Sequence, residues 1–343
     1  MTALRIGTRG SALALAQARA VAAHLPVPAE LVTVTTAGDV DRARGDKSRW
    51  TGALEAALLA GDIDLAVHSA KDVPAELAPG TAIIAAPRRA DPVDVLVGER
   101  SLDAVREGAR VGTSALRRRA QLLAARPDLE VAELRGNVDT RLRKRAAGEV
   151  DVLVLAAAGL ERLERRGEAG GALAGEVFVP AAGQGVLAIQ ARTASAAADS
   201  ASAVNHAPTM AALEAERAAI RALGANCHAP VGIHAHVAAG LLQMRGFAGL
   251  PDGSAWLVDE LVVEPGASST RTTRSSATGE PLGEGEAASE ALREAEAASE
   301  ALREAEAAGE ALREAEAAGE ALARRMLAAG ARDLLRDAEA MAA

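Results

Sequence analysis

The sequence predicts an α/β protein with two similar lobes around a cleft and a smaller C-terminal α+β domain. Three observations lead to this prediction. Short apolar runs alternate with helical patterns over about the first two hundred residues, as in layered α/β structures. The alternation restarts after Pro87, which indicates a second lobe. From Pro208 onward, one helical pattern precedes alternating strands and a strong turn signal at 251–254.

The first lobe is predicted to comprise two segments of the chain, residues 1–88 and 186–205. It begins with a strand at 4–8 and a helix that Ser11 caps. Further along we expect a β-branched strand at 31–36, a polar loop at 38–49, a helix at 53–59 and a buried strand at 63–68.

The second lobe is predicted at 89–185 and the third domain at 206–343. The expected strands of the second lobe are 94–97, 110–113, 131–135 and 151–156, with helices from Ser114 and at 140–147. The run at 151–156 is almost entirely apolar, as in a parallel strand that is covered on both faces. The third domain opens with a helix at 210–223.

Composition excludes several classes of protein. The 343-residue chain has a net charge of −9, which argues against a generic nucleic-acid coat. We find no signal-peptide pattern and no apolar run long enough to span a membrane. The single Cys cannot form an internal disulfide. We therefore expect a cytoplasmic monomer without nucleic-acid or membrane partners, and its cores should be small-residue interfaces, because Ala supplies about half of the apolar residues.

Residues 286–320 contain a decapeptide repeat, with Leu at 292, 302 and 312. Its Ala, Glu, Leu and Arg content favours a helix. Ten residues turn a helix by about 1000°, so the leucines do not form a continuous stripe. We expect an inserted, solvated helix rather than a partner-binding arm, and we expect activity to survive its deletion.

Three arginine-rich segments each adjoin the end of a predicted strand, at 8–11, 112–119 and 134–141. Such junctions direct backbone N–H groups and the positive end of a helix toward a cleft, which favours anions. Arginine adds bidentate recognition of carboxylates. One such segment would be ordinary surface sequence, but three together predict a site for a polyanionic ligand.

Two further segments contain reactive side chains. Lys71 and Asp72 directly follow a buried strand, where a carboxylate acts either as a general acid or as a capping group paired with the lysine. Cys227 lies beside His228 in a small-residue loop. It is either an inert core residue or a site of covalent chemistry. His234 and His236 share a strand face, which is weak support for a metal site, and we predict no metal.

Read together, the motifs resemble the porphobilinogen deaminase family over nearly the whole chain except 284–320. Any one motif is weakly specific, but seven in order are highly specific. They are the segments 7–11 with Leu13 and Gln17, 68–74, 112–118, 134–138 with 140–142, 158–163, 180–185 and the loop around Cys227.

The resemblance implies an enzyme of tetrapyrrole biosynthesis with two periplasmic-binding-protein-like lobes. It would join four porphobilinogen units head to tail and release ammonia at each addition. A dipyrromethane cofactor would be attached to Cys227 through a thioether, and Asp72 would be the catalytic carboxylate. The substrate carries an acetate and a propionate, and the residues expected to bind these groups are Arg9, Arg117, Arg118, Arg135 and Arg141, assisted by Ser11, Lys71, Ser114 and Asn137.

The chain departs from the family pattern at 45–52, where we expect Lys47 and Trp50 to replace the basic and aromatic members of a loop that covers the site. The second family Lys falls near Gly52, and we carry over no anion-binding Arg from 165–175. Two alternatives are a non-catalytic two-lobed anion-binding protein and a relative that the altered loop has inactivated.

Overall fold

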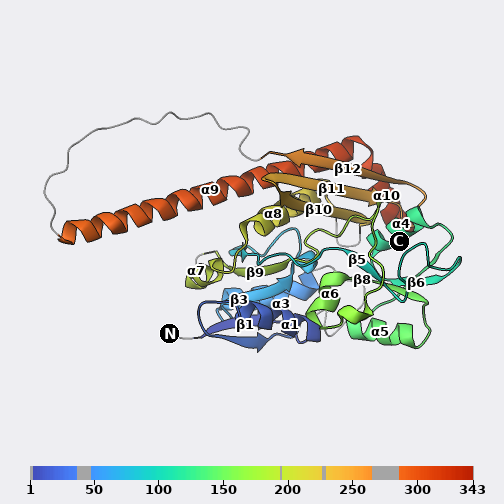
Figure 1. The fold of residues 1–343 in the computed structure, drawn as a ribbon, viewed down its shortest axis with the longest axis horizontal. Coiled ribbons are helices and arrows are strands. Elements are labelled where there is room, and N and C mark those ends of the chain that lie inside the picture. Colours follow the sequence, from blue (N-terminus) through green and yellow to red (C-terminus); the bar gives the residue numbers. More distant parts are fainter. Residues whose placement is uncertain (1–2, 37–47, 194, 226–228, 265–285, 343) are drawn as a thin grey trace.

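The computed structural model describes residues 3–36, 48–193, 195–225, 229–264 and 286–342. Three β-sheets form within these ranges. Figure 1 shows the first lobe, mostly blue, and the second, mostly green, with the C-terminal domain in orange and red above them. The α/β class with two lobes and an additional α+β domain is therefore confirmed.

The first lobe has a five-stranded sheet in the order β2-β1-β3-β9-β4. Its elements are β1 (Leu4–Thr8), α1 (Ala12–Ala22), β2 (Ala29–Thr33), α3 (Ser48–Ala60), β3 (Leu65–Ser69), η1 (Ala70–Asp72), β4 (Thr81–Ala85), β9 (Leu187–Arg192) and α7 (Ala196–Ser202). Strand β1 runs parallel to β2 and β3, whereas β9 is antiparallel to β3 and β4. As predicted, Ser11 caps α1, because its hydroxyl accepts a hydrogen bond from Ala14 N at 3.3 Å.

The second lobe has a four-stranded sheet in the order β5-β8-β6-β7. Its elements are β5 (Asp94–Val97), β6 (Arg110–Thr113), α4 (Leu116–Ala125), β7 (Glu130–Glu133), α5 (Val138–Ala146), β8 (Val152–Ala156), α6 (Ala157–Arg162) and η2 (Arg166–Glu168). Alternate residues of β8 belong to two different apolar clusters, so this strand is covered on both faces as predicted. It is parallel to β6 but antiparallel to β5.

The C-terminal domain packs helices against an antiparallel sheet, β10-β11-β12. Its elements are α8 (Ala207–Leu223), β10 (Val231–Ala238), β11 (Leu241–Gly249), β12 (Trp256–Val263), α9 (Glu286–Ala328) and α10 (Ala331–Ala342). Alanines make up much of its buried cluster, as the composition predicts, whereas the buried clusters of the second lobe consist almost entirely of Val and Leu, so the expected small-residue packing is confirmed only for the C-terminal domain. The turn at 251–254 connects β11 to β12, as predicted.

Several local predictions differ from the structure. Strand β2 begins at Ala29 rather than 31, and α4 begins at Leu116 rather than Ser114. Strand β7 ends at Glu133, so Arg135 lies in the turn that follows. Part of the expected loop 38–49 is helical, because α3 begins at Ser48, and the rest lies outside the described residues. Strands β4 and β9 were not predicted, because both are short and have no clear alternating pattern.

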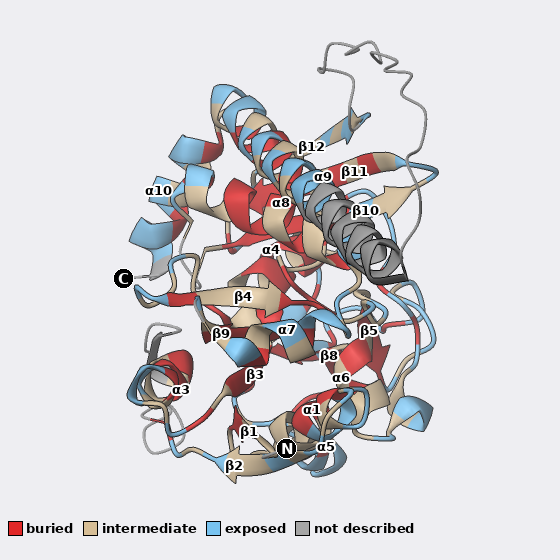
Figure 2. Ribbon diagram, turned by 90° about the vertical axis from the view of Figure 1, so that its left-hand side faces the viewer, coloured by how far each residue is buried: buried red, intermediate tan, exposed pale blue. Residues whose placement is uncertain are grey.

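The expectation of a solvated repeat is wrong for its last unit. Helix α9 includes the repeat and continues into the core, where Ala315, Ala318 and Leu322 are buried against α8. A Cβ on Gly319 would lie 2.1 Å from the carbonyl oxygen of Ala215, so the two helices approach each other closely there. Figure 2 shows the exposed, pale blue turns of α9 giving way to buried ones where the helix crosses the domain.

Candidate active site

Two chain segments cross between the lobes, one after β4 and one before β9, and both meet a buried carboxylate of α8. Glu216 accepts hydrogen bonds from Arg89 Nη1 at 2.6 Å, Gly183 N at 2.5 Å and Ala235 N at 2.7 Å. Burial by itself would raise the pKa of Glu216, but the charges and hydrogen bonds of Arg89 and His234 together outweigh it and the pKa is lowered. The ionised carboxylate therefore fastens both crossings to the third domain.

The second crossing passes close to the segment that carries Lys71. Gly183 has a φ of +73°, and a Cβ there would lie 2.8 Å from the backbone nitrogen of Lys71. Gly185 has a φ of +86°, and its Cβ would lie 2.4 Å from Ala90 O. Positive φ and missing space both require glycine at these two positions. Gln184, between them, is thereby held within reach of both lobes.

A cavity of about 320 Å³ lies where the three domains meet, which is within the usual size range of ligand sites. Among the described residues its charged lining consists of Lys71, Asp72, Arg117, Arg118, Arg141 and Arg217. Asp72 is the one carboxylate in this set. Because the whole chain carries a net charge of −9, this local excess of cations indicates a site that recognises anions.

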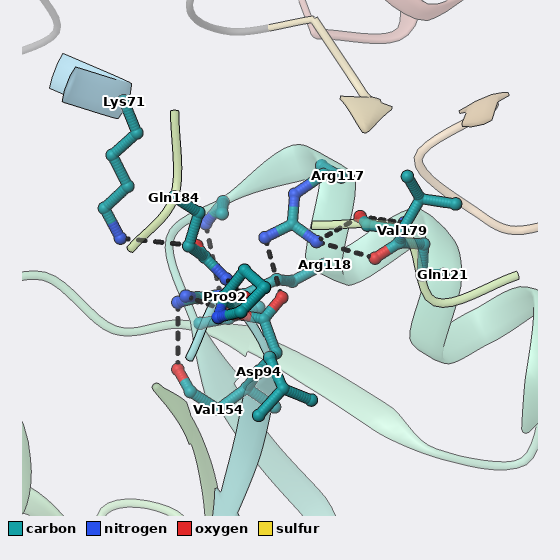
Figure 3. A network of polar contacts seen from close by, with 12 residues as sticks. Lys71, Pro92, Asp94, Arg117, Arg118, Gln121, Val154, Val179 and Gln184 are labelled. Atoms are coloured by element: carbon teal, nitrogen blue, oxygen red, sulfur yellow. Dashed lines mark hydrogen bonds and ion pairs between the residues drawn. The ribbon is translucent and has the colours of Figure 1, made fainter. Parts of the chain in front are cut away.

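Asp94 binds two of these arginines, Arg117 and Arg118 (Figure 3). Its Oδ2 accepts from Arg117 Nη2 at 2.7 Å, and its Oδ1 accepts from Arg118 Nη2 at 2.7 Å and Nε at 3.1 Å. All three residues are buried. Burial by itself would raise the pKa of Asp94, but the two guanidinium charges outweigh it and hold the pKa far below its usual value. Arg117 and Arg118 are therefore fixed by an ionised partner.

Lys71 belongs to the other lobe and reaches the same network through Gln184. Its Nζ donates to Gln184 Oε1 at 3.4 Å. Burial, together with the charge of Arg118, lowers the pKa of Lys71 to about 8. Asp72 follows Lys71 at the end of η1, where it is half-buried and lines the cavity. Lys71 therefore donates to an amide oxygen rather than forming the salt bridge with a capping Asp72 that the sequence left open.

Arg141, on α5, is the arginine with the clearest unused donor. Its Nη2 donates to Ser114 Oγ at 3.0 Å, whereas its Nε is buried and has no hydrogen-bond partner among the described residues. Burial and the neighbouring charge of Arg118 lower the pKa of Arg141 to about 10. A buried cationic donor without an acceptor is costly, so the site is suited to receive an anionic group at this position.

Comparison with known proteins agrees with these features. The family model described as porphobilinogen deaminase, dipyromethane cofactor binding domain, matches residues 4–200, and the model of the C-terminal domain matches 210–274. Porphobilinogen deaminase of Deinococcus radiodurans is 43% identical over 74% of this chain and 87% of its own length. Porphobilinogen deaminase of Roseiflexus sp. is 46% identical over 73% of this chain and 87% of its own length. That of Thermus thermophilus is 44% identical over 76% of this chain and 90% of its own length. The chain belongs to the porphobilinogen deaminase family.

A solved structure with partial similarity is a periplasmic substrate-binding protein of an ABC transporter from Coxiella burnetii. It matches 59% of this chain and 91% of its own, with 13% sequence identity and a TM-score of 0.36. Among the helices that the structure describes, none has the length and apolar character needed to cross a membrane.

The structure brings together six of the residues that the resemblance to porphobilinogen deaminases selected. Lys71, Asp72, Ser114, Arg117, Arg118 and Arg141 all line the cavity. They come from η1 of the first lobe and from α4, α5 and the turn before α4 in the second. The strand ends and helix starts that carry them converge as the α/β pattern predicted, although their roles in binding and catalysis stay a prediction.

Four other residues selected from the porphobilinogen deaminase pattern, Arg9, Ser11, Arg135 and Asn137, are not in the lining of this cavity. The Arg9 guanidinium carbon lies 4.0 Å from the centre of the Trp50 ring. Asn137 Oδ1 caps α5 by accepting from Thr140 N at 2.9 Å, just as Ser11 caps α1. Arg135 is exposed and pairs with a neighbouring glutamate at 2.7 Å. A binding role for these four residues stays a prediction.

Cys227 and Lys47 lie outside the described residues. Ala225 and Ala229, on either side of the segment that contains Cys227, both line the cavity. His234 and His236 stack with ring centres 5.7 Å apart. Nowhere in the described ranges do three or more His, Cys, Asp or Glu side chains gather closely enough to hold a metal ion.

Four polar residues in or near the cavity of this porphobilinogen deaminase relative were not predicted as site residues. Gln184 and Arg217 line the cavity, Asp94 binds its lining residues Arg117 and Arg118, and Arg162 lines a small neighbouring pocket that also includes Lys71. Arg217 donates to Ala75 O at 2.8 Å, and Arg162 donates to Gly185 O at 2.7 Å. Burial lowers the pKa of both arginines, that of Arg162 to about 10. The available signals were an acid at the start of an apolar strand and a glutamine between two glycines.

Proposed function

We propose that the chain is a hydroxymethylbilane synthase, a transferase that joins four porphobilinogen units head to tail and releases ammonia at each addition. The observation that carries the proposal is the cavity of a porphobilinogen deaminase relative in which Asp72 faces a lining of cations. Each porphobilinogen brings an acetate and a propionate, so the growing chain gains carboxylates that such a lining can bind.

The donor set also fits a dipyrromethane cofactor, which carries the same carboxylate side chains. Lys71, Ser114, Arg141 and Arg217 present donors to the cavity, and Arg141 Nε is buried without an acceptor. We propose that these residues hold the cofactor, and that Cys227 attaches it through a thioether. When bound, the cofactor supplies the pyrrole to which new units are added. The position of Ala225 and Ala229 in the cavity lining supports this attachment.

We assign the proton transfer to Asp72. Its carboxyl group would give a proton to the aminomethyl nitrogen of porphobilinogen, and the carbon–nitrogen bond would break with its electron pair leaving on ammonia. The Asp72 carboxylate would then remain beside the positive charge on the pyrrole and stabilise it. In a site where the other charged lining groups are cations, a carboxylate is the group suited to this role.

Intact mass spectrometry of the purified chain beside a Cys227→Ser variant tests the attachment. We expect added mass equal to two linked pyrrole units in the natural chain and none in the variant, since this is the single cysteine. An unmodified natural chain that also fails to gain mass or release ammonia with porphobilinogen would favour the anion-binding alternative.

Turnover tests the assignment of Asp72. An Asp72→Asn variant should keep the cofactor mass but lose most of its ammonia release. Asp128→Asn is a matched control, because Asp128 forms a salt bridge with Arg126 near the surface of the second lobe and should leave turnover unchanged. Equal rates in the Asp72 and Asp128 variants would contradict the assignment.

The proposal includes a monomer that works in the cytoplasm. Large apolar side chains exposed within the described residues are Leu59, Trp256, Val262 and Met341, which are spread over α3, β12 and α10 rather than gathered on one surface. Sedimentation velocity should give the mass of one chain, and a dimer at micromolar concentration would contradict this part of the proposal.

A further inference from the structure

Gln184 uses every hydrogen-bonding group of its side chain in linking the two lobes. Its Nε2 donates to Pro92 O at 2.5 Å and to Asp94 Oδ1 at 2.8 Å, and its Oε1 accepts from Lys71 Nζ at 3.4 Å. The residue is 1% exposed. Figure 3 shows the amide between Lys71 on one side and Asp94 on the other.

The orientation of this amide is determined by its neighbours. A flipped amide would place Oε1 against the Pro92 carbonyl and the Asp94 carboxylate, two acceptors, and would point its N–H groups at an ammonium, which is itself a donor. Asp94 is ionised because Arg117 and Arg118 surround it, so it demands a donor. The lysine is therefore always offered an oxygen.

We propose that Gln184 is a positioning residue that presents an acceptor to the Lys71 ammonium and thereby couples the Asp94–Arg117–Arg118 cluster of the second lobe to the segment of the first lobe that carries Asp72. The coupling follows from geometry, since the backbone on either side of Gln184 is closely packed: a Cβ on Gly183 or on Gly185 would lie within 3 Å of backbone atoms of Lys71 or Ala90. Lys71 keeps its charge and its place beside Asp72 through a residue of the crossing segment.

Four charged groups act on the Lys71 ammonium. Asp72 on its own turn and Asp94 on β5 favour it, whereas Arg117 and Arg118 on α4 disfavour it. Arg141 on α5 and Arg217 on α8 line the same cavity, and Arg162 on α6 lines a small neighbouring pocket that also includes Lys71. Burial has already lowered the pKa of Lys71 to about 8. With its pKa near 8, Lys71 is partly deprotonated close to neutral pH, so a neutral acceptor that favours the ammonium form changes the fraction of Lys71 that is charged there.

The chain makes this proposal directly measurable, because it contains three lysines and five glutamines. Lysine labelled with ¹³C at its ε-carbon gives one titration curve per lysine, and a Lys71→Arg variant assigns the curve. In Gln184→Met, which keeps the shape but loses the acceptor, we expect the Lys71 midpoint to fall by about half a unit to one unit.

Gln121→Met is the matched control. Gln121 is equally buried and accepts from Arg117 Nη1 at 2.9 Å, but it does not contact Lys71. Its replacement should leave the Lys71 midpoint unchanged. An unchanged midpoint in Gln184→Met, or an equal change in both variants, would overturn the proposal.

A measurement on the natural chain covers the case in which Gln184→Met does not fold. With ¹⁵N-labelled glutamine, the side-chain amide signals of Gln184 should shift with pH at the same midpoint as Lys71. Signals that stay constant through that titration would overturn the coupling.

The kinetic consequence rests on the proposed function, in which the Lys71 ammonium binds substrate carboxylates. The kcat/KM of the natural chain should decline as pH rises through about 8, mainly through KM, and in Gln184→Met the decline should begin at lower pH. A chain without synthase activity would show no such profile, whereas the two NMR titrations would still decide the coupling, so the two failures are distinguishable.

Discussion

Replacing Asp94 by asparagine should destabilise the second lobe far more than its small change in shape suggests. The carboxylate accepts three hydrogen bonds from Arg117 and Arg118 and one from Gln184, in a site where the aspartate and both arginines are at most 6% exposed. An amide offers one oxygen and turns N–H groups toward a guanidinium. Two buried cations would lose their counter-charge, which costs about 3–5 kcal/mol.

The comparison should be made at neutral pH. The folded-state pKa of Asp94 is lowered, so its contribution to stability is fully present above the unfolded pKa of about 4 and is lost as pH falls further. Asp333→Asn is the control, because Asp333 pairs with Arg336 at 3.0 Å on an exposed surface. Exposed pairs contribute about 1 kcal/mol or less.

Hydrogen exchange read by mass spectrometry on peptides from β5 and β8 measures the effect in the lobe concerned. The expected loss corresponds to about two to four orders of magnitude in exchange rate for Asp94→Asn, and urea unfolding should move to lower concentration. The reasoning would be refuted if Asp94→Asn cost no more than Asp333→Asn, since the cluster would then not depend on its carboxylate.

Three further predictions follow from packing and burial. Gly319→Ala should lower the melting temperature, because its Cβ would meet Ala215 O at 2.1 Å, whereas Gly309→Ala, at the same repeat position and with only the end of a flexible arginine side chain nearby, should raise helix stability slightly. Burial lowers the pKa of His68 to about 4, so the unfolded chain binds more protons than the folded chain between about pH 4 and 6.5. The free energy of unfolding should therefore fall by about 3 kcal/mol as the pH is lowered from 6.5 to 4, and His68→Gln should flatten this profile. Deletion of 290–309 should preserve ammonia release and melting temperature, since the remaining repeat unit retains the packed sequence; loss of turnover in that folded variant would contradict the prediction.

The fold and part of the site could be predicted because their signals are local. Apolar runs such as the one that forms β8 announce buried strands, and Lys71, Ser114 and Arg141 each lie close to the end of such a run. The converging ends of parallel strands then bring these residues together without further information. The same pattern also selects Arg9, Ser11, Arg135 and Asn137, which do not line the cavity, so it indicates the region of the site but not its exact lining.

The polar network beneath the cavity could not be predicted in the same way. Gln184 and Asp94 are 90 positions apart in sequence, and Lys71 and Gln184 are 113 apart. No periodicity connects such residues, and an aspartate at the start of a strand is usually exposed. Asp94 is buried because α4 brings Arg117 and Arg118 to its carboxylate and the crossing segment adds Gln184.

The repeat helix shows the same division between local and non-local information. Its identical units predict one conformation for all of them, and the helix indeed continues through the whole repeat. Burial differs between units because Leu322, Ala323 and Met326 follow the last unit and are fully buried, so they anchor α9 in the core. The preceding turn then lies against the small side chains of α8, at Gly319, and no unit carries a sequence of its own for that contact. Position relative to the anchor decides which copy is buried, and a change in the number of copies should therefore leave the packed contact, and the cavity that α8 helps to line, as they are.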